Sequence, residues 1–206
     1  MVERQLRARG IDDERVLAAM ATVPRELFVP EDARGRAYDD AALAIGGGQT
    51  ISQPYMVALI CSGLRLSGGE RVLDVGTGSG YQAAVLAEMG AEVNTIERVP
   101  ELAEQAREAL EAAGYADRVE VHVGDGTRGL PAEAPFAAIA VAAAAPGVPQ
   151  PLYDQLVEGG RLVVPIGHRR EQLLQVVVRS PDGPATLAGV PCRFVPLVGA
   201  AGFRGR

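Results

Sequence analysis

The sequence is poor in aromatic residues and cysteine, and it has no long apolar run. No tryptophan, five tyrosines and four phenylalanines argue against a surface on which sugars or nucleic-acid bases stack. Two cysteines, Cys61 and Cys192, form no motif and suit a reducing compartment. No stretch approaches the roughly 18 apolar residues of a membrane-spanning helix, and the charged first residues are unlike a signal peptide. We therefore expect a cytoplasmic protein with no membrane partner.

Charge and reactive side chains exclude further classes of function. The net charge is −6 and no segment is rich in basic residues, so nucleic acid is not expected as a partner. The sequence has no Ser-His-Asp arrangement, no Cys-His pair and no cluster with metal-ligand spacing. Its two histidines, His122 and His168, stand alone and are expected to be structural or exposed.

The distribution of apolar residues predicts an α/β fold. With 206 residues and 48% apolar composition, the chain is long enough for one domain, 1–206. The pattern predicts a doubly wound, mostly parallel seven-stranded sheet with helices on both faces and an antiparallel hairpin at one edge. The expected strands are residues 71–75, 92–96, 119–123, 136–141 and 161–165, the expected helices are 79–89, 100–113 and 149–157, and the hairpin uses 173–178 and 186–195.

Within that domain we distinguish a region that precedes the sheet (1–58), a core (59–168) and a C-terminal hairpin (169–206). The first region has an acidic helix start at residues 12–14 and a stop at 23–24. Residues 30–55 then read as a long irregular loop, which is more often functional than filler. A short helix is expected over about 56–62.

A glycine-rich segment follows the first strand of the core. It reads Asp74-Val75-Gly76-Thr77-Gly78-Ser79-Gly80. Alternate glycines let the backbone turn tightly, expose N–H groups and approach a ligand closely, and the preceding carboxylate demands a cation. A dinucleotide-binding loop would place its third glycine at position 81, which is Tyr81. The observed spacing instead resembles the first motif of S-adenosylmethionine-dependent methyltransferases.

Two further acids end the next two strands. Glu97, followed by Arg98, lies where a carboxylate can accept hydrogen bonds from both hydroxyls of a ribose. Asp125, followed by Gly126, lies where methyltransferases of this class often present an acid to the adenine amino group. We therefore expect Asp74, Glu97 and Asp125 to point into one crevice at the carboxyl ends of the strands.

The segment before the core narrows the resemblance to one family. Gly48-Gln49-Thr50-Ile51-Ser52-Gln53-Pro54-Tyr55-Met56-Val57-Ala58 resembles the signature of protein-L-isoaspartate O-methyltransferases. Other blocks match in family order between about residues 3 and 198, namely 23–30, 38–40, 76–82, 95–98, 124–127, 159–167 and 193–197. The resemblance implies methyl transfer from S-adenosyl-L-methionine to the α-carboxylate of isoaspartyl residues in proteins and peptides. The ester then closes to a succinimide, whose hydrolysis restores some normal aspartate, and we expect a monomer.

The resemblance also implies the site residues. Those expected to bind the cofactor are Gln49, Thr50, Ile51, Asp74, Gly76, Thr77, Gly78, Ser79, Gly80, Glu97, Arg98, Asp125 and Gly126. Ser52 is the expected catalytic residue, with its hydroxyl on the acceptor carboxylate; alternatively, Thr50 and Ser52 cap the helix that begins near Pro54. A carboxylate is ionised at neutral pH and needs no general base, so the protein has to supply position and exclude water.

One block departs from the family pattern. After the fourth strand the family usually reads Phe-Asp-x-Ile-x-Val-Thr, whereas this chain has Ala137 and Ala142 in place of the acid and the threonine. Because this segment borders the expected acceptor pocket, we expect Val141 and Ala142 to bind substrate through backbone N–H groups.

Three alternatives stay open. They are a methyltransferase of the same fold acting on normal aspartate in a modified peptide, a nicotinamide-dependent dehydrogenase, and a non-catalytic S-adenosylmethionine-binding module. The position of the third glycine argues against the dehydrogenase, and the presence of Ser52, Glu97 and Asp125 argues against the module.

Overall fold

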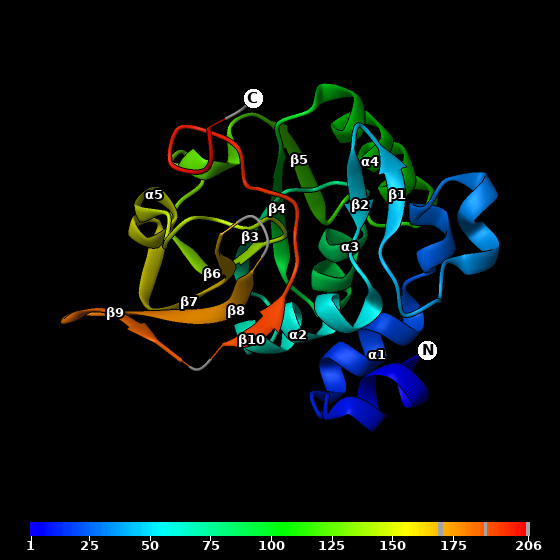
Figure 1. Cartoon of the computed structure of the whole chain (residues 1–206), viewed down its shortest axis with the longest axis horizontal. Coiled ribbons are helices and arrows are strands. Elements are labelled where there is room, and N and C mark those ends of the chain that lie inside the picture. Colours follow the sequence, from blue (N-terminus) through cyan, green and yellow to red (C-terminus); the bar gives the residue numbers. More distant parts are fainter. Residues whose placement is uncertain (169–170, 188, 205–206) are drawn as a thin grey trace.

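The main sheet of the computed structural model, which describes residues 1–168, 171–187 and 189–204, confirms the α/β prediction (Figure 1). Its strands are β3 (Arg71–Val75), β4 (Glu92–Glu97), β5 (Val119–Val123), β6 (Phe136–Val141), β7 (Leu156–Gly167), β8 (Gln172–Ser180), β9 (Gly183–Thr186) and β10 (Val190–Cys192). Seven of them follow the order β10–β8–β7–β6–β3–β4–β5, and β9 pairs with β8. Strands β3 to β7 pair in parallel, whereas β8 is antiparallel to β7, β9 and β10.

The sheet is covered on both faces, and alternation along each strand decides which side chain meets which layer. The helices are α1 (Glu14–Thr22), α2 (Pro54–Leu64), α3 (Tyr81–Glu88), α4 (Pro100–Ala112) and α5 (Gln150–Asp154). In β3, Val72 packs in the cluster that contains residues of α1 to α4, whereas Leu73 and Val75 pack in the opposite cluster with α5. Asp74 therefore faces the side of α3, as Val72 does.

The chain reverses its direction of travel across the sheet at β3. It runs from β3 to β4 and β5 on one side, then returns to place β6 on the other side of β3. Ligands of open α/β sheets bind in the crevice outside the carboxyl ends of the strands at such a point. The fold thus locates the site between the ends of β3, β4 and β6.

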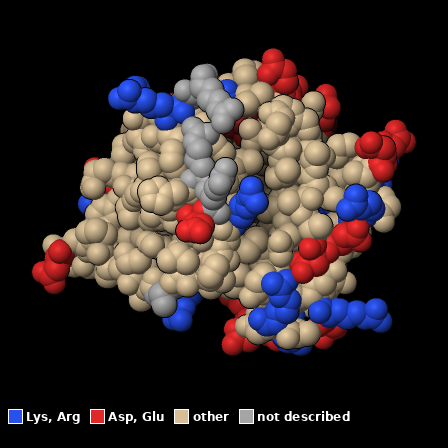
Figure 2. Space-filling model, in the orientation of Figure 1, with Lys and Arg blue, Asp and Glu red and all other residues tan. Residues whose placement is uncertain are grey.

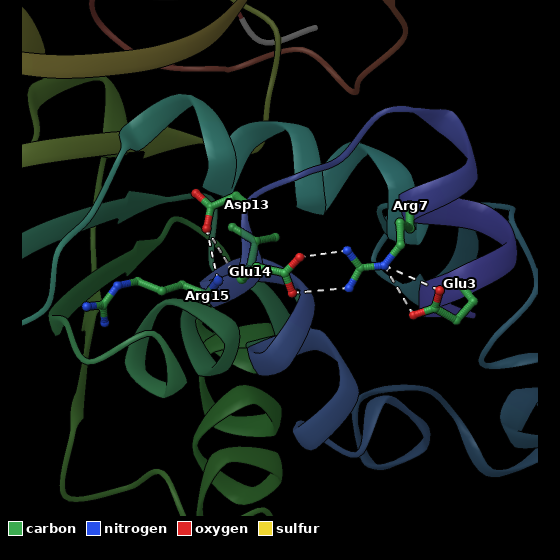
Figure 3. Close-up of polar contacts among 6 residues, drawn as sticks. Glu3, Arg7, Asp13, Glu14 and Arg15 are labelled. Atoms are coloured by element: carbon green, nitrogen blue, oxygen red, sulfur yellow. Dashed lines mark hydrogen bonds and ion pairs between the residues drawn. The ribbon is translucent and has the colours of Figure 1, made fainter.

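The helix start near residue 12 is confirmed, with Asp13 as its cap (Figure 3). The Asp13 carboxylate accepts hydrogen bonds from the N–H groups of Arg15 (3.0 Å) and Val16 (3.3 Å), which a helix start would otherwise leave unpaired. Beside it, the Arg7 guanidinium pairs with Glu14 at 2.6 Å and with Glu3 at 3.3 Å (Figure 3). Two short helical segments precede α1; they are η1 (Val2–Leu6) and η2 (Arg7–Arg9).

The prediction of an irregular loop over residues 30–55 is wrong. This segment holds the 3-10 helix η4 (Glu31–Arg36), which follows η3 (Arg25–Phe28), and a hairpin of β1 (Leu43–Gly46) and β2 (Gln49–Ile51). Gly47 and Gly48, with φ of 56° and 71°, form its two-residue turn, and Gly46 at the end of β1 also has a positive φ of 95°. The glycines serve the hairpin, and β2 lines one cavity together with Val75 at the end of β3 and Glu97 at the end of β4.

The C-terminal part also differs from the prediction. The expected helix 149–157 ends at Asp154, because Leu156 is fully buried and pairs with Phe136 of β6 as the first residue of β7. The expected hairpin strand 186–195 is instead two short strands, β9 and β10, both paired with β8. Residues 169–170, 188 and 205–206 of the predicted region 169–206 lie outside the described residues. No helix in the described ranges is long and apolar enough to span a membrane.

Candidate active site

A cavity of about 300 Å³ lies at the carboxyl ends of β3 and β4, where the order of strands reverses. This volume is within the range of small-molecule sites. Most of the predicted site residues line it: Gln49, Thr50, Ile51, Ser52, Gly76, Thr77, Gly78, Ser79, Glu97, Arg98, Gly126 and Ala142. Segments far apart in the chain therefore meet at one cavity, as predicted.

Four predicted residues do not line the cavity, and several that do were not predicted. Asp74, Gly80, Asp125 and Val141 are absent from its wall. The residues that the prediction missed are Gly48, Val57, Val75, Tyr81, Gln82, Ile96, Ala143 and 195–198. Residues 81 and 82 lie at the start of the predicted helix, and 195–197 belong to the block 193–197 that matches the family, so the blocks of resemblance could have indicated both segments.

Ser52 follows β2 and faces the cavity. Its carbonyl accepts a hydrogen bond of 2.7 Å from Nη2 of Arg25, which fixes the backbone at this point. Within the described ranges its hydroxyl has no hydrogen-bond partner. The alternative in which Thr50 and Ser52 cap α2 is wrong, because Gln53 is the N-cap and no side chain caps this helix. The hydroxyl is thus available to a ligand.

The glycine loop turns as predicted, but four of its N–H groups already donate hydrogen bonds within the protein. Gly76, Gly78 and Gly80 have φ values of 92°, 53° and 88°, which favour glycine. The N–H groups of Gly76 and Thr77 donate to the Ile96 carbonyl, at 2.9 and 3.3 Å. Gly80 donates to the Thr77 carbonyl, and Gly78 to Glu97. With these donors already paired, the loop does not form the cradle of free N–H groups that a pyrophosphate requires.

The carboxylate of Asp74 lies beneath the cavity rather than in it. It is fully buried and accepts hydrogen bonds from Nε2 of Gln82 (2.7 Å) and the hydroxyl of Thr95 (2.9 Å). Burial raises its pKa to about 6, against the stabilising effect of these two bonds. The prediction of direct contact with a cation fails because alternation along β3 turns Asp74 toward α3.

Asp74 nevertheless orients two side chains that line the cavity. The Thr95 hydroxyl uses its one hydrogen to donate a hydrogen bond to Asp74. In the contact of 2.6 Å between the hydroxyls of Thr77 and Thr95, Thr77 therefore has to be the donor. The side-chain amide of Gln82 donates a hydrogen bond to Asp74 through Nε2, and its oxygen is buried with no partner among the described residues. The cavity wall therefore presents oxygen acceptors, which suit a ligand rich in donors or positively charged.

Glu97 is placed as predicted, at the end of β4 and in the cavity wall. It is 6% exposed, and its two carboxylate oxygens accept hydrogen bonds from the N–H groups of Gly78 and Val99, both at 3.0 Å. Each oxygen keeps a second acceptor position. A rigidly held carboxylate of this kind can accept two neighbouring hydroxyl groups.

Asp125 is occupied by the protein itself, which corrects the prediction that it points into the crevice. One oxygen accepts from the N–H and hydroxyl of Thr127, and the other accepts from the N–H of Ala200 at 2.8 Å. Although burial raises its pKa, the bonds from Ala200 and Thr127 bring it below its usual value. Asp125 thus anchors the C-terminal segment, whose residues 195–198 close one side of the cavity.

The structure also places Val141 and Ala142, in the segment that departs from the family's sequence pattern. Val141 is fully buried on the face opposite α3 and does not reach the cavity, while the Ala142 side chain does. The Ala142 N–H donates to the Val75 carbonyl at 2.9 Å, so it is not free to bind a carboxylate. The prediction of backbone donors at these two residues is wrong, because the N–H continues the pairing between β6 and β3.

The two histidines lie outside the cavity, as predicted. Nε2 of His122, on β5, is 2.9 Å from Oδ1 of Asn94 on the neighbouring strand. His168 is exposed at the end of β7, where its carbonyl accepts a hydrogen bond from Gln172.

Comparison with known proteins connects this site to one family. The family model for protein-L-isoaspartate(D-aspartate) O-methyltransferase matches residues 1–202. A protein-L-isoaspartate O-methyltransferase of Methanoculleus marisnigri is 54% identical over 206 residues, covering 100% of this chain and 93% of the relative. One from Hyperthermus butylicus is 54% identical over 99% of this chain and 89% of its own.

Solved structures agree with the sequence relatives. A protein-L-isoaspartate O-methyltransferase structure superposes with a TM-score of 0.86 at 29% identity, over 98% of this chain and 67% of that one. A Plasmodium falciparum enzyme described by the same name, in complex with S-adenosyl-L-homocysteine, gives a TM-score of 0.79 at 30% identity, over 96% of each chain. Together with the match over nearly the whole length, these relatives show that the chain belongs to the protein-L-isoaspartate(D-aspartate) O-methyltransferase family.

Proposed function

We propose that this protein transfers a methyl group from S-adenosyl-L-methionine to the α-carboxylate of isoaspartyl residues in damaged proteins and peptides. The observation that carries the proposal is the unpartnered Ser52 hydroxyl, which shares one cavity with Glu97 and the glycine loop. A group able to bind an acceptor therefore lies in the same cavity as a group able to bind a ribose. Family membership over residues 1–202 supports the proposal.

The residues of the cavity fit S-adenosyl-L-methionine. Glu97 would accept the two ribose hydroxyls, and the unpartnered amide oxygen of Gln82 and the hydroxyl of Thr77 would accept from the ammonium group. The relative from Plasmodium falciparum was solved with S-adenosyl-L-homocysteine, the demethylated product. When bound, the cofactor supplies a methyl group activated by a sulfonium sulfur. A phosphate-bearing dinucleotide fits less well, because the loop N–H groups are already paired.

The protein contributes position and a water-poor environment. The Ser52 hydroxyl donates a hydrogen bond to the acceptor carboxylate, which stays ionised, and holds it in line for attack. Apolar side chains of Val57, Ile96 and Leu197 line the same cavity. Because opposite charges are neutralised as the new bond forms, low polarity around the reacting atoms favours the transition state. Titration of a general base is not needed, since the acceptor carboxylate is already ionised at neutral pH.

We also infer the domain organisation, oligomeric state and location of the protein. One apolar cluster joins Leu6 and α1 with β7 and β8, which supports a single domain over residues 1–206. We infer that it acts as a monomer, because all the proposed binding groups come from one chain. We infer a cytoplasmic location, because Cys61 and Cys192 are both free.

Calorimetry tests the cofactor assignment. S-adenosyl-L-homocysteine should bind the wild type, and Glu97→Gln should weaken binding by ~1.5–3 kcal/mol, because charge-assisted bonds to the ribose are lost. Unchanged affinity in a folded Glu97→Gln protein would remove Glu97 from the site. Methylation of an isoaspartyl peptide by the wild type, followed by succinimide formation, tests the reaction. Tight binding of a nicotinamide dinucleotide without methyl transfer would overturn the proposal.

A further inference from the structure

Arg25 is a buried arginine with no acidic partner among the residues that the structure describes. Its side chain is 0% exposed and lies in η3, between α1 and the β1–β2 hairpin. Within residues 1–168, 171–187 and 189–204, no carboxylate lies within ion-pair distance of it. Surface arginines behave differently: Arg7, Arg9 and Arg107, for example, each pair with an acid, and Arg side chains lie among Asp and Glu in Figure 2. A buried charge without a counter-charge is costly and calls for an explanation.

The polar contacts of Arg25 satisfy only part of its guanidinium. Nε donates to the Ala37 carbonyl and Nη2 to the Ser52 carbonyl, each at 2.7 Å. The guanidinium carbon lies 4.6 Å from the centre of the Tyr81 ring, a cation–π contact. Nη1 is buried and has no hydrogen-bond partner among the described residues. Burial accordingly lowers the pKa of Arg25.

Both groups that Arg25 contacts on its cavity side form part of the cavity wall. Ser52 and Tyr81 line the cavity, whereas Arg25 lies directly behind them. The Tyr81 hydroxyl is also buried and forms no well-aligned hydrogen bond among the described residues, although its interaction with the Arg25 guanidinium opposes the lowering of the Arg25 pKa by burial. The positive charge is thus separated from the cavity by one layer of protein, and Arg25 and Tyr81 are both buried.

A purely structural role does not account for the charge. Two backbone carbonyls can be joined by a neutral amide, which avoids the cost of desolvating a cation. The charge is useful if an anion enters the cavity beside Ser52, because Coulomb attraction is strong where the local dielectric constant is low. The acceptor of the proposed reaction is such an anion.

We propose that Arg25 is a positioning residue for the acceptor. Its guanidinium fixes the Ser52 backbone from behind, and its unpaired charge attracts the substrate carboxylate into the cavity. This inference rests on the proposed function, since it takes the isoaspartyl α-carboxylate as the anion. The attraction acts mainly on the bound substrate, because the carboxylate loses its charge as the methyl ester forms, so the effect belongs to substrate affinity more than to turnover.

Two peptides and three proteins, the wild type and two variants of Arg25, test the charge. The peptides are one isoaspartyl sequence with a free α-carboxylate and the same sequence with an α-carboxamide, each bound to protein saturated with S-adenosyl-L-homocysteine. In the wild type the carboxylate peptide should bind at least about tenfold more tightly. Arg25→Gln should reduce this ratio to below about threefold, and Arg25→Lys, which keeps the charge, should retain most of it. Affinity for S-adenosyl-L-homocysteine should stay the same in all three proteins.

Arg179 offers a matched control. It too donates to two backbone carbonyls, of Asp154 and Leu156, with its guanidinium carbon 5.9 Å from the Tyr153 ring centre, but none of these residues lines the cavity. Arg179→Gln should therefore behave as the wild type in both binding measurements.

Several results would overturn the inference. The first is equal affinity of the wild type for the carboxylate and carboxamide peptides, and the second is an unchanged preference for the carboxylate peptide in folded Arg25→Gln. The others are an equal loss of this preference in Arg25→Lys and Arg25→Gln, and a parallel loss of affinity for S-adenosyl-L-homocysteine. If Arg25→Gln does not fold, the wild-type ratio and Arg25→Lys carry the test. Absence of methyl transfer by a wild type that still prefers the carboxylate peptide would contradict the proposed function instead.

Discussion

Asp74 and Gln82 share a hydrogen bond of 2.7 Å beneath the cavity, and Thr95 donates to the other oxygen of the same carboxylate at 2.9 Å. At neutral pH this places an ionised group in a fully buried position. The two donors reduce the cost of that charge without removing it, since burial still brings the pKa from 3.8 to about 6. The residue thus orients the cavity wall at the expense of stability.

The raised pKa of Asp74 predicts that the free energy of unfolding depends on pH. Because the pKa of Asp74 is higher in the folded protein, its neutral form favours folding fully below about pH 3.8, and this contribution is lost as the pH rises through about 6. Between these values the wild type should lose on the order of 3 kcal/mol relative to Asp74→Asn, whose side chain does not titrate. Urea unfolding of both proteins from pH 4 to 7 measures the difference, and a constant difference would contradict the assignment.

The role proposed for Ser52 predicts a separation of binding from turnover. Ser52→Ala should keep its affinity for S-adenosyl-L-homocysteine within about twofold and lower methylation turnover by roughly 10- to 100-fold, because a hydrogen bond to a charged acceptor is lost. Ser62→Ala removes a buried, unpartnered hydroxyl from α2, away from the cavity, and should leave turnover unchanged. If Ser52→Ala retains wild-type turnover, Ser52 has no catalytic role.

At the scale of the element, the cap of α1 should contribute to stability and not to catalysis. Asp13→Ala leaves the Arg15 and Val16 N–H groups without their acceptor and should lower the free energy of unfolding by about 1 kcal/mol. Turnover and KM should not change, since α1 does not reach the cavity. Denaturant unfolding of Asp13→Ala beside Asp12→Ala separates the cap from the general effect of an acid at this helix end. Equal losses in the two variants would contradict the assigned cap.

The elements that the sequence predicted well are those whose pattern is local. Strand β3 and helix α4 carry their periodicity and end signals within a few residues, and both lie close to their expected positions. The β1–β2 hairpin was not predicted although Gly47-Gly48 is a typical two-residue hairpin turn, because its strands of four and three residues are too short to show a clear alternation. The early start of β7 was missed because the burial of Leu156 depends on pairing with distant Phe136.

At the scale of the whole molecule, the site combines segments that no local pattern relates. The glycine spacing and the Ser52 segment were predictable because each motif is contiguous in the sequence. The use of Asp125 was not, because its partner Ala200 lies 75 residues later in the chain. Similarly, the unpaired charge of Arg25 becomes visible only when the fold brings residues 25, 52 and 81 together. Motifs thus identified the cavity, and the distribution of hydrogen bonds identifies which of its residues are free to act.

The acceptor carboxylate has a different position in the two forms of aspartate. An isoaspartyl residue carries its free carboxylate directly on Cα, whereas normal aspartate carries it one methylene further out. A cavity that aligns one carboxylate with the methyl donor misplaces the other by more than about an ångström, a shift that can cost about 100-fold in rate. Ala142 leaves slightly more space than a threonine would, but Ser52 remains in place.

The most direct test measures kcat/KM with labelled S-adenosyl-L-methionine for two peptides of one sequence, differing only in an isoaspartyl or an aspartyl residue. We expect the isoaspartyl peptide to be methylated about 100-fold more efficiently. Equal or more efficient methylation of the aspartyl peptide would contradict the repair function and favour a methyltransferase that modifies normal aspartate.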